Sequence, residues 1–166
     1  MDLGLLVVRL VVGLVMAGHG AQKLFGWFGG HGIAGVGGFL EQLGFRPGRL
    51  FALAAGLSEF GGGVLLAVGL LGPVAPAALV SVMIVAAATV HWQNGLFAMS
   101  NGIELPLLYG AIAAGLALTG FGEYSLDHGL GLAGTFTPAV NAGLLGLGIV
   151  GGFANLALRR PTPIVA

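Results

Sequence analysis

Apolar residues run along most of this chain in long blocks, and short clusters of glycine, proline and polar residues separate the blocks. A helix needs about 20 mostly apolar residues to cross the hydrocarbon core of a bilayer. Several blocks reach or approach that length, and turn or helix-start signals lie between them. The pattern predicts membrane-spanning helices at about residues 3–25, 50–71, 74–92, 104–120 and 138–158.

The breaks between these helices carry recognisable turn signals. Leu71-Gly72-Pro73 predicts a tight hairpin between the second and third helices, because proline disfavours continuation of a helix. Asn101, followed three residues later by Glu104, predicts a helix start with Asn101 as the N-cap. Thr137-Pro138 predicts another start, with proline at the first helical position.

The connection between the first and second helices has a pattern of its own. Apolar residues recur at helical spacing from Ile33 to Leu43, while Glu41 and Gln42 fall on the other side. This pattern predicts a short amphipathic helix at about residues 33–44 that lies along the membrane surface.

Composition makes lipid the solvent for most of this protein's surface. Hydrophobic residues make up 57% of the chain and charged residues only 7%, with a mean hydropathy of +1.00. A soluble domain carries roughly a quarter charged residues, which this chain lacks. We therefore expect an all-α membrane protein that forms a single domain over residues 1–166. An alternative has four spans, with the last apolar stretch lying on the membrane surface.

Charge and cysteine content exclude several classes of function. The net charge is zero and no basic run occurs, so nucleic acid is not an expected partner. The absence of cysteine excludes thiol–disulfide chemistry and an iron–sulfur cluster on this chain.

The positions of the charges predict an orientation in the membrane. With five spans, the first connection and the C-terminus lie on the same side, which the positive-inside rule makes cytoplasmic. The start of the chain lacks the basic region of a secretory signal, so we expect the first apolar block to remain as an anchor with the N-terminus outside. The basic residues that set this orientation are Lys23, Arg46, Arg49, Arg159 and Arg160.

Ionisable residues within or at the ends of the apolar blocks form the candidate functional site. Such groups are costly at membrane depth unless they face protein, a partner charge or water. At about 100° per residue, Arg9, His19 and Lys23 fall on one face of the first helix. The other candidates come from the next three helices at a depth similar to that of Lys23. We expect an intramembrane polar pocket for protons or a small ligand, such as a quinone headgroup or an anion, built from Arg9, His19, Lys23, Glu59, His91 and Glu104.

Simpler roles remain open for these residues. Glu104 would only cap its helix, Lys23 would only reach the headgroups, and His91 would only lie at the interface. Arg9 and Glu59 would form a structural ion pair. No metal site is expected, because no helix carries a His-x-x-x-His or Glu-x-x-His pair.

Two further patterns concern packing and loops. Gly148 and Gly152 have the small-xxx-small spacing that lets membrane helices approach closely. Tyr124, Asp127 and His128 lie in the connection before the last helix, and we expect them to form a solvated turn.

A series of motifs is similar to those of a known membrane-protein family. The chain carries Arg9 in VVRLVVG and then GHGAQKLFGWFGG at residues 18–30, which together resemble the N-terminal signature of the DoxX family. The later segments follow in the family's order: LSEFGGGVLLAVGLL, ATVHWQNGLF, NGIELPLLYG and GFGEYSLD. The resemblance covers about residues 3–127 and implies a bacterial inner-membrane protein with a four-helix transmembrane bundle. The last apolar stretch would add a fifth helix.

The resemblance also implies a functional setting. The family takes its name from a relative that is a membrane subunit of a thiosulfate:quinone oxidoreductase, and other members are linked to sulfur and oxidative-stress redox systems. This chain is therefore expected to work with other membrane or membrane-associated redox proteins and to carry no electrons itself. A quinone is the candidate cofactor. The alternatives are a non-catalytic membrane scaffold and a small proton-coupled transporter, and an oligomer is compatible with each.

Overall fold

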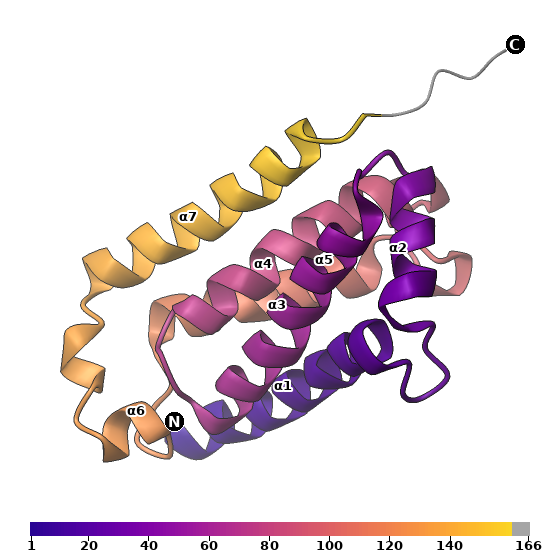
Figure 1. Cartoon of the computed structure of the whole chain (residues 1–166). Helices are drawn as coiled ribbons and strands as arrows, with labels where there is room; N and C mark the ends of the chain where they lie inside the picture. The colour runs from indigo at the N-terminus through magenta and orange to yellow at the C-terminus, as the bar shows by residue number, and fades with distance from the viewer. Residues whose placement is uncertain (161–166) are drawn as a thin grey trace, which may run out of the picture.

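Every regular element is a helix within residues 1–160, which the computed structural model of the protein describes (Figure 1). The long helices are α1 (Asp2–Phe25), α3 (Gly48–Val68), α4 (Val74–Ala86), α5 (Glu104–Thr119) and α7 (Pro138–Ala157). The fourth helix continues through a π-helical turn, η1 (Ala87–His91), and a 3₁₀ turn, η2 (Trp92–Asn94). The short elements are α2 (Gly32–Gln42), η3 (Ala98–Ser100), α6 (Leu126–Gly129) and η4 (Ala133–Thr135).

The predicted all-α membrane bundle with a spanning C-terminal helix is confirmed. Four helices are long and apolar enough to cross a bilayer, namely Asp2–Phe25, Gly48–Val68, Val74–Asn94 and Pro138–Ala157. Helix α5 has 16 residues and so extends about 24 Å, less than the roughly 30 Å hydrocarbon core. The protein is a multi-pass membrane protein, and α5, which the sequence predicted as a span at about residues 104–120, is shorter than the four helices that are long enough to cross.

Glycine brings α1 and α3 into direct backbone contact. A β-carbon on Gly20 would lie 2.2 Å from the nitrogen of Phe60, and one on Gly63 would lie 2.4 Å from the nitrogen of Ala17. No larger residue fits at such distances, so these glycines allow the two helices to pack along their length. This close approach sets the residues near the end of α1 level with the middle of α3.

Helix α4 is the centre of the bundle and packs against α3, α5 and α7. The last helix lies along the outside of the bundle (Figure 1) and reaches α4 through glycine. A β-carbon on Gly148 would lie 2.4 Å from the carbonyl oxygen of Ala77, and one on Gly152 would lie 3.0 Å from that of Ser81. The predicted packing role of these two glycines is confirmed.

The turns match the sequence prediction at two places and differ at a third. Leu71 and Gly72 have φ values of 64° and 46°, which close the hairpin before α4. The Thr137 hydroxyl accepts from the Val140 amide at 3.4 Å and caps α7. The prediction of Asn101 as N-cap of α5 is wrong. Asn101 instead has a left-handed φ of 61° and ends η3, so α5 begins after Ile103.

Helix α2 occupies the segment expected to lie on the membrane surface. It lies at the end of the bundle where α1 finishes and α3 begins, opposite the N-terminus and α6 (Figure 1). Trp27 and Phe28, in the connection before it, are exposed. Its position along the membrane surface stays a prediction.

Candidate functional site

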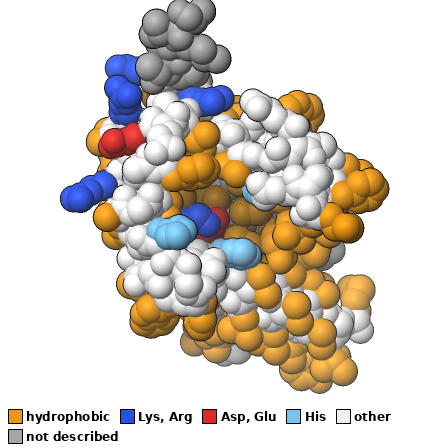
Figure 2. Space-filling view, turned by 90° about the vertical axis from the view of Figure 1, so that its right-hand side faces the viewer, with side chains coloured by type: hydrophobic (Ala, Val, Ile, Leu, Met, Phe, Trp, Pro, Cys, Tyr) orange, Lys and Arg blue, Asp and Glu red, His pale blue; other side chains and the backbone are white. Residues whose placement is uncertain are grey.

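A cavity of about 290 Å³ opens at the end of the bundle that carries α2. We call it the polar cavity. Helices α1, α3, α4 and α5 form its walls with the end of η1 and the following loop. Figure 2 shows the hollow, with a basic and an acidic side chain inside it and histidine side chains beside it. Its lining consists of Met16, His19, Lys23, Glu59, Met83, Ala86, His91, Asn101, Leu105, Pro106 and Tyr109.

Lys23 and Glu59 form an ion pair between α1 and α3 on the wall of the polar cavity. The ammonium group of Lys23 donates to Oε2 of Glu59. The Glu59 side chain is 4% exposed, whereas that of Lys23 is 28% exposed. The acid is therefore enclosed by protein, and the lysine is the partner that faces the open space. The backbone contact at Gly20 makes this meeting possible, because Lys23 lies one turn further along α1.

His91 is held at the opposite wall by the loop before α5. Its Nδ1 lies 2.8 Å from the carbonyl oxygen of Asn101. A carbonyl only accepts hydrogen bonds, so Nδ1 carries the proton and Nε2 is the acceptor of the neutral ring. Asn94 donates to the same carbonyl at 3.2 Å. The π-helical turn Ala87–His91 positions this ring, and such turns are frequent at functional sites.

His19 lies on α1 one turn before Lys23 and faces α5. Its ring meets that of Tyr109 edge-on, with 6.3 Å between the ring centroids. Both rings line the polar cavity. The Tyr109 hydroxyl adds a group that both donates and accepts hydrogen bonds. Sequence reasoning missed Tyr109, although its place one turn after Leu105 on an apolar helix puts it on the same face.

Two of the six predicted site residues do not line the polar cavity. Glu104 is the first residue of α5 and lies close to the cavity, but its carboxylate accepts a hydrogen bond from the backbone amide of Ala98 at 2.7 Å. It therefore holds the loop over residues 95–103 closed instead of facing the cavity. The role of the remaining four residues, His19, Lys23, Glu59 and His91, as a ligand or proton site stays a prediction.

Arg9 is fully buried at the opposite end of the bundle. It lies about 20 Å from Lys23 along α1 at 1.5 Å per residue, so a shared helix face does not bring the two to one depth. Its guanidinium donates to the carbonyl oxygen of Phe121 and, at 2.6 Å, to that of Tyr124. The residue is 0% exposed. Arg9 thus anchors the connection after α5 and does not pair with Glu59.

Asp127 shares this anchoring role, and its predicted solvation is wrong. It is 3% exposed, and its carboxylate accepts from the amides of Leu71 at 2.9 Å and Gly72 at 2.6 Å. Its own amide donates to Gly69 at 2.9 Å. The hairpin before α4 leaves backbone amides without helical partners, and the aspartate satisfies two of them.

A second polar cavity of about 480 Å³ lies at this opposite end. Its acidic residues mostly serve the backbone. Asp2 accepts from the amide of Glu123 at 3.2 Å, and Asp127 is bound to the hairpin. These contacts hold the loops onto the helix ends. Across residues 1–160, no three histidine, aspartate or glutamate side chains converge in a way that would hold a metal ion.

Comparison with known proteins identifies one family. The family model described as DoxX matches residues 4–92, which is more than half of the chain. The match covers α1 to the start of η2 and includes His19, Lys23, Glu59 and His91. No curated protein and no solved structure matches the chain.

Proposed function

Because this chain belongs to the DoxX family of integral membrane proteins, we propose that it is a membrane subunit of a redox complex and that its polar cavity holds the headgroup of a quinone. The Lys23–Glu59 pair carries this proposal. A buried acid and a partly exposed ammonium meet on the wall of a cavity that His19 and His91 also line. Ionisable groups kept at membrane depth mark functional positions by default.

The size of the polar cavity suits a small headgroup. Its volume of about 290 Å³ is close to the lower limit for ligand pockets, which is roughly 300 Å³. The apolar residues Met16, Met83 and Leu105 would contact a ring, while the polar groups would bind its oxygens. A long apolar tail would stay in the bilayer.

The polar groups have complementary chemical roles. The ammonium group of Lys23 has three N–H donors and uses one toward Glu59, so another is free to donate to a quinone oxygen. Nε2 of His91, the ring nitrogen that is not bound to Asn101, would form a hydrogen bond with the headgroup. Reduction of a quinone to a quinol consumes two electrons and two protons. The chain has no cysteine for thiol redox chemistry, and we assign the electrons to a partner redox protein.

A scaffold function is the second candidate, and the same ion pair supports it. The pair joins α1 to α3 beside the glycine contact, so it would stabilise the bundle without any ligand. A scaffold needs the pair for assembly, whereas a quinone site also needs the open space beside it.

We further propose that the protein resides in the bacterial inner membrane with its N-terminus outside. The end with α2 carries Arg46, Arg49 and Arg160, all exposed, and the positive-inside rule would make this end cytoplasmic. The polar cavity would then open toward the cytoplasm, where a partner could deliver electrons.

Direct ligand binding tests the proposal. We expect a short-tailed benzoquinone analogue to bind the protein in lipid nanodiscs with saturation in isothermal titration calorimetry. Lys23→Met and Glu59→Gln should weaken the Kd at least about tenfold, which corresponds to about 1.4 kcal/mol. Glu41→Gln is the matched control, because Glu41 is exposed on α2 and the amide oxygen still accepts from Gly48. If wild-type protein shows no saturable binding, the quinone proposal fails and the scaffold function is favoured.

A further inference from the structure

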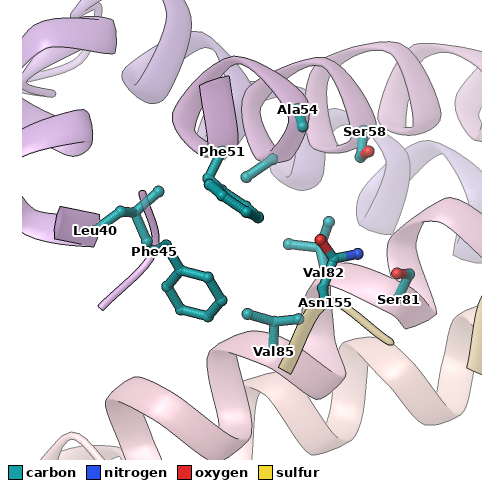
Figure 3. A pocket seen from close by; sticks show the side chains of 10 residues that line it. Leu40, Phe45, Phe51, Ala54, Ser58, Ser81, Val82, Val85 and Asn155 are labelled. Atoms are coloured by element: carbon teal, nitrogen blue, oxygen red, sulfur yellow. The ribbon is translucent and has the colours of Figure 1, made fainter. Parts of the chain in front are cut away.

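A lateral crevice lies between α3, α4 and α7, apart from the polar cavity. Its volume is about 90 Å³, and Phe45 is one of the residues that line it toward the end of the bundle that carries α2. Figure 3 shows the rings of Phe45 and Phe51 on one side of the space, and Val82 of α4 next to Asn155 of α7 on the other. We call it the lateral crevice; its lining consists of Leu40, Phe45, Phe51, Ala54, Ala55, Ser58, Ser81, Val82, Val85 and Asn155.

The lateral crevice extends from the end of the bundle into the depth of the hydrocarbon core. Ser58 lies ten residues after the start of α3 at Gly48, which is about 15 Å along the helix axis. This distance is about half of the roughly 30 Å core. Hydrocarbon surrounds the bundle at this depth, and the crevice walls are mostly apolar, so an acyl chain matches them. The volume is well below the roughly 300 Å³ of a pocket for a whole ligand, so it fits a segment of one chain.

Arginines gather where the lateral crevice meets the end of the bundle. Nε of Arg159 donates to the carbonyl oxygen of Leu43 at 2.5 Å, and the Arg160 amide donates to that of Gly44 at 2.8 Å. These contacts fix the end of α7 beside the connection that continues into Phe45 and Arg46. Figure 2 shows a group of basic side chains at the upper edge of this end of the molecule.

The charge of this region is strongly positive. Arg46 and Arg160 are exposed, and Arg159 is partly buried with its Nε bound to the backbone. Glu41 is the acid on the neighbouring helix, and its carboxylate accepts from the Gly48 amide at 3.0 Å. Arg49 packs against α2, where a β-carbon on Gly37 would lie 3.1 Å from its Cγ. Within residues 1–160, neither Arg46 nor Arg160 takes part in an ion pair, so both are suited to bind an anion at the headgroup level.

We infer that the lateral crevice and the arginines at its mouth bind an anionic phospholipid of the surrounding leaflet. One acyl chain places a segment between Phe51, Val82 and Asn155, and the phosphate contacts Arg46 and Arg160. Arginine binds phosphate through charge-assisted hydrogen bonds, and basic pockets between membrane helices favour acidic headgroups. The apolar crevice begins at Phe45, the residue next to Arg46, and would favour a lipid over free phosphate. This inference is independent of the quinone proposal, because it uses neither Lys23 nor Glu59.

Lipid titration of the delipidated protein in detergent tests this inference. The midpoint of thermal unfolding is followed as phosphatidylglycerol or phosphatidylcholine with the same acyl chains is added, since a ligand of the folded state raises the midpoint. We expect phosphatidylglycerol to raise the unfolding midpoint at a concentration at least about tenfold lower than phosphatidylcholine does. Inorganic phosphate at the same concentration should have no effect. Equal action of the two lipids, or an equal effect of phosphate, would overturn the inference.

Two kinds of variant distinguish the contribution of the lipid headgroup to binding from that of the acyl chain. Arg46→Gln/Arg160→Gln changes only exposed side chains and should remove the preference for phosphatidylglycerol. Ala55→Phe fills the lateral crevice and should weaken the binding of both lipids. Leu57→Phe adds the same ring on α3 outside the crevice and should leave the binding of both lipids unchanged. If the double arginine variant keeps the wild-type preference, the lipid site is refuted whatever the crevice variants do.

Discussion

The Lys23 ammonium group reaches across from α1 to the Glu59 carboxylate of α3, and the two partners differ sharply in exposure. Glu59 is enclosed, while Lys23 keeps 28% of its side chain open to the polar cavity. The asymmetry leaves part of the Lys23 side chain exposed at the wall of the polar cavity, while the enclosed acid holds the lysine in place.

The ion pair predicts unequal effects of single and double substitutions on stability. Lys23→Met leaves the Glu59 carboxylate buried without its cation, and breaking a buried pair costs about 3–5 kcal/mol. We expect the lower end of that range, because Lys23 is partly exposed. The double variant Lys23→Met/Glu59→Leu should recover much of the loss, as judged by thermal unfolding in detergent. A double variant less stable than both single variants would contradict the assigned pairing.

The Asp127 carboxylate predicts a local effect on the hairpin before α4. Asp127→Ala leaves the amides of Leu71 and Gly72 without their acceptor, which costs about 1–3 kcal/mol. Hydrogen exchange should therefore accelerate at residues 71–72. Glu123→Ala is the control, because Glu123 is exposed and lies in the same loop. Unchanged exchange in Asp127→Ala would show that the carboxylate is not bound there.

The packing of α7 on α4 predicts a difference between two glycines of one helix. Gly148→Ala places a methyl group 2.4 Å from a backbone oxygen of Ala77, so α7 must shift, at a cost of about 1–3 kcal/mol. Gly143→Ala meets nothing within 4 Å and should leave stability unchanged or slightly higher. Thermal unfolding of the two variants distinguishes the sites. Equal destabilisation would mean that α7 does not contact α4 through Gly148.

The sequence predicted much of the fold because the signals are local. Apolar length located the long helices, and Pro138 after Thr137 marked the start of α7. The prediction of Asn101 as an N-cap failed because asparagine tolerates a left-handed φ, and it therefore ends a turn as readily as it caps a helix. Both outcomes place the residue just before a helix, and only the structure distinguishes them.

The candidate site was predicted where depth and helix face agree, and was missed elsewhere. Lys23 and Glu59 meet because both conditions hold. Arg9 shares the helix face of Lys23 but lies at the other end of α1, so helical periodicity alone wrongly included Arg9 in the polar cavity. Asp127 was missed because the amides it binds belong to a hairpin far away in the sequence, at Leu71 and Gly72. No local pattern around Asp127 signals those partners.

Photo-crosslinking with a short-tailed azidoquinone, mapped by peptide mass spectrometry, tests whether the polar cavity receives the headgroup of a quinone beside Lys23. We predict saturable labelling within residues 16–23 of α1 and 105–109 of α5, at sites facing the cavity, and reduced labelling in Glu59→Gln. Labelling spread over the lipid-facing sides of all helices, unchanged in that variant, would contradict the claim.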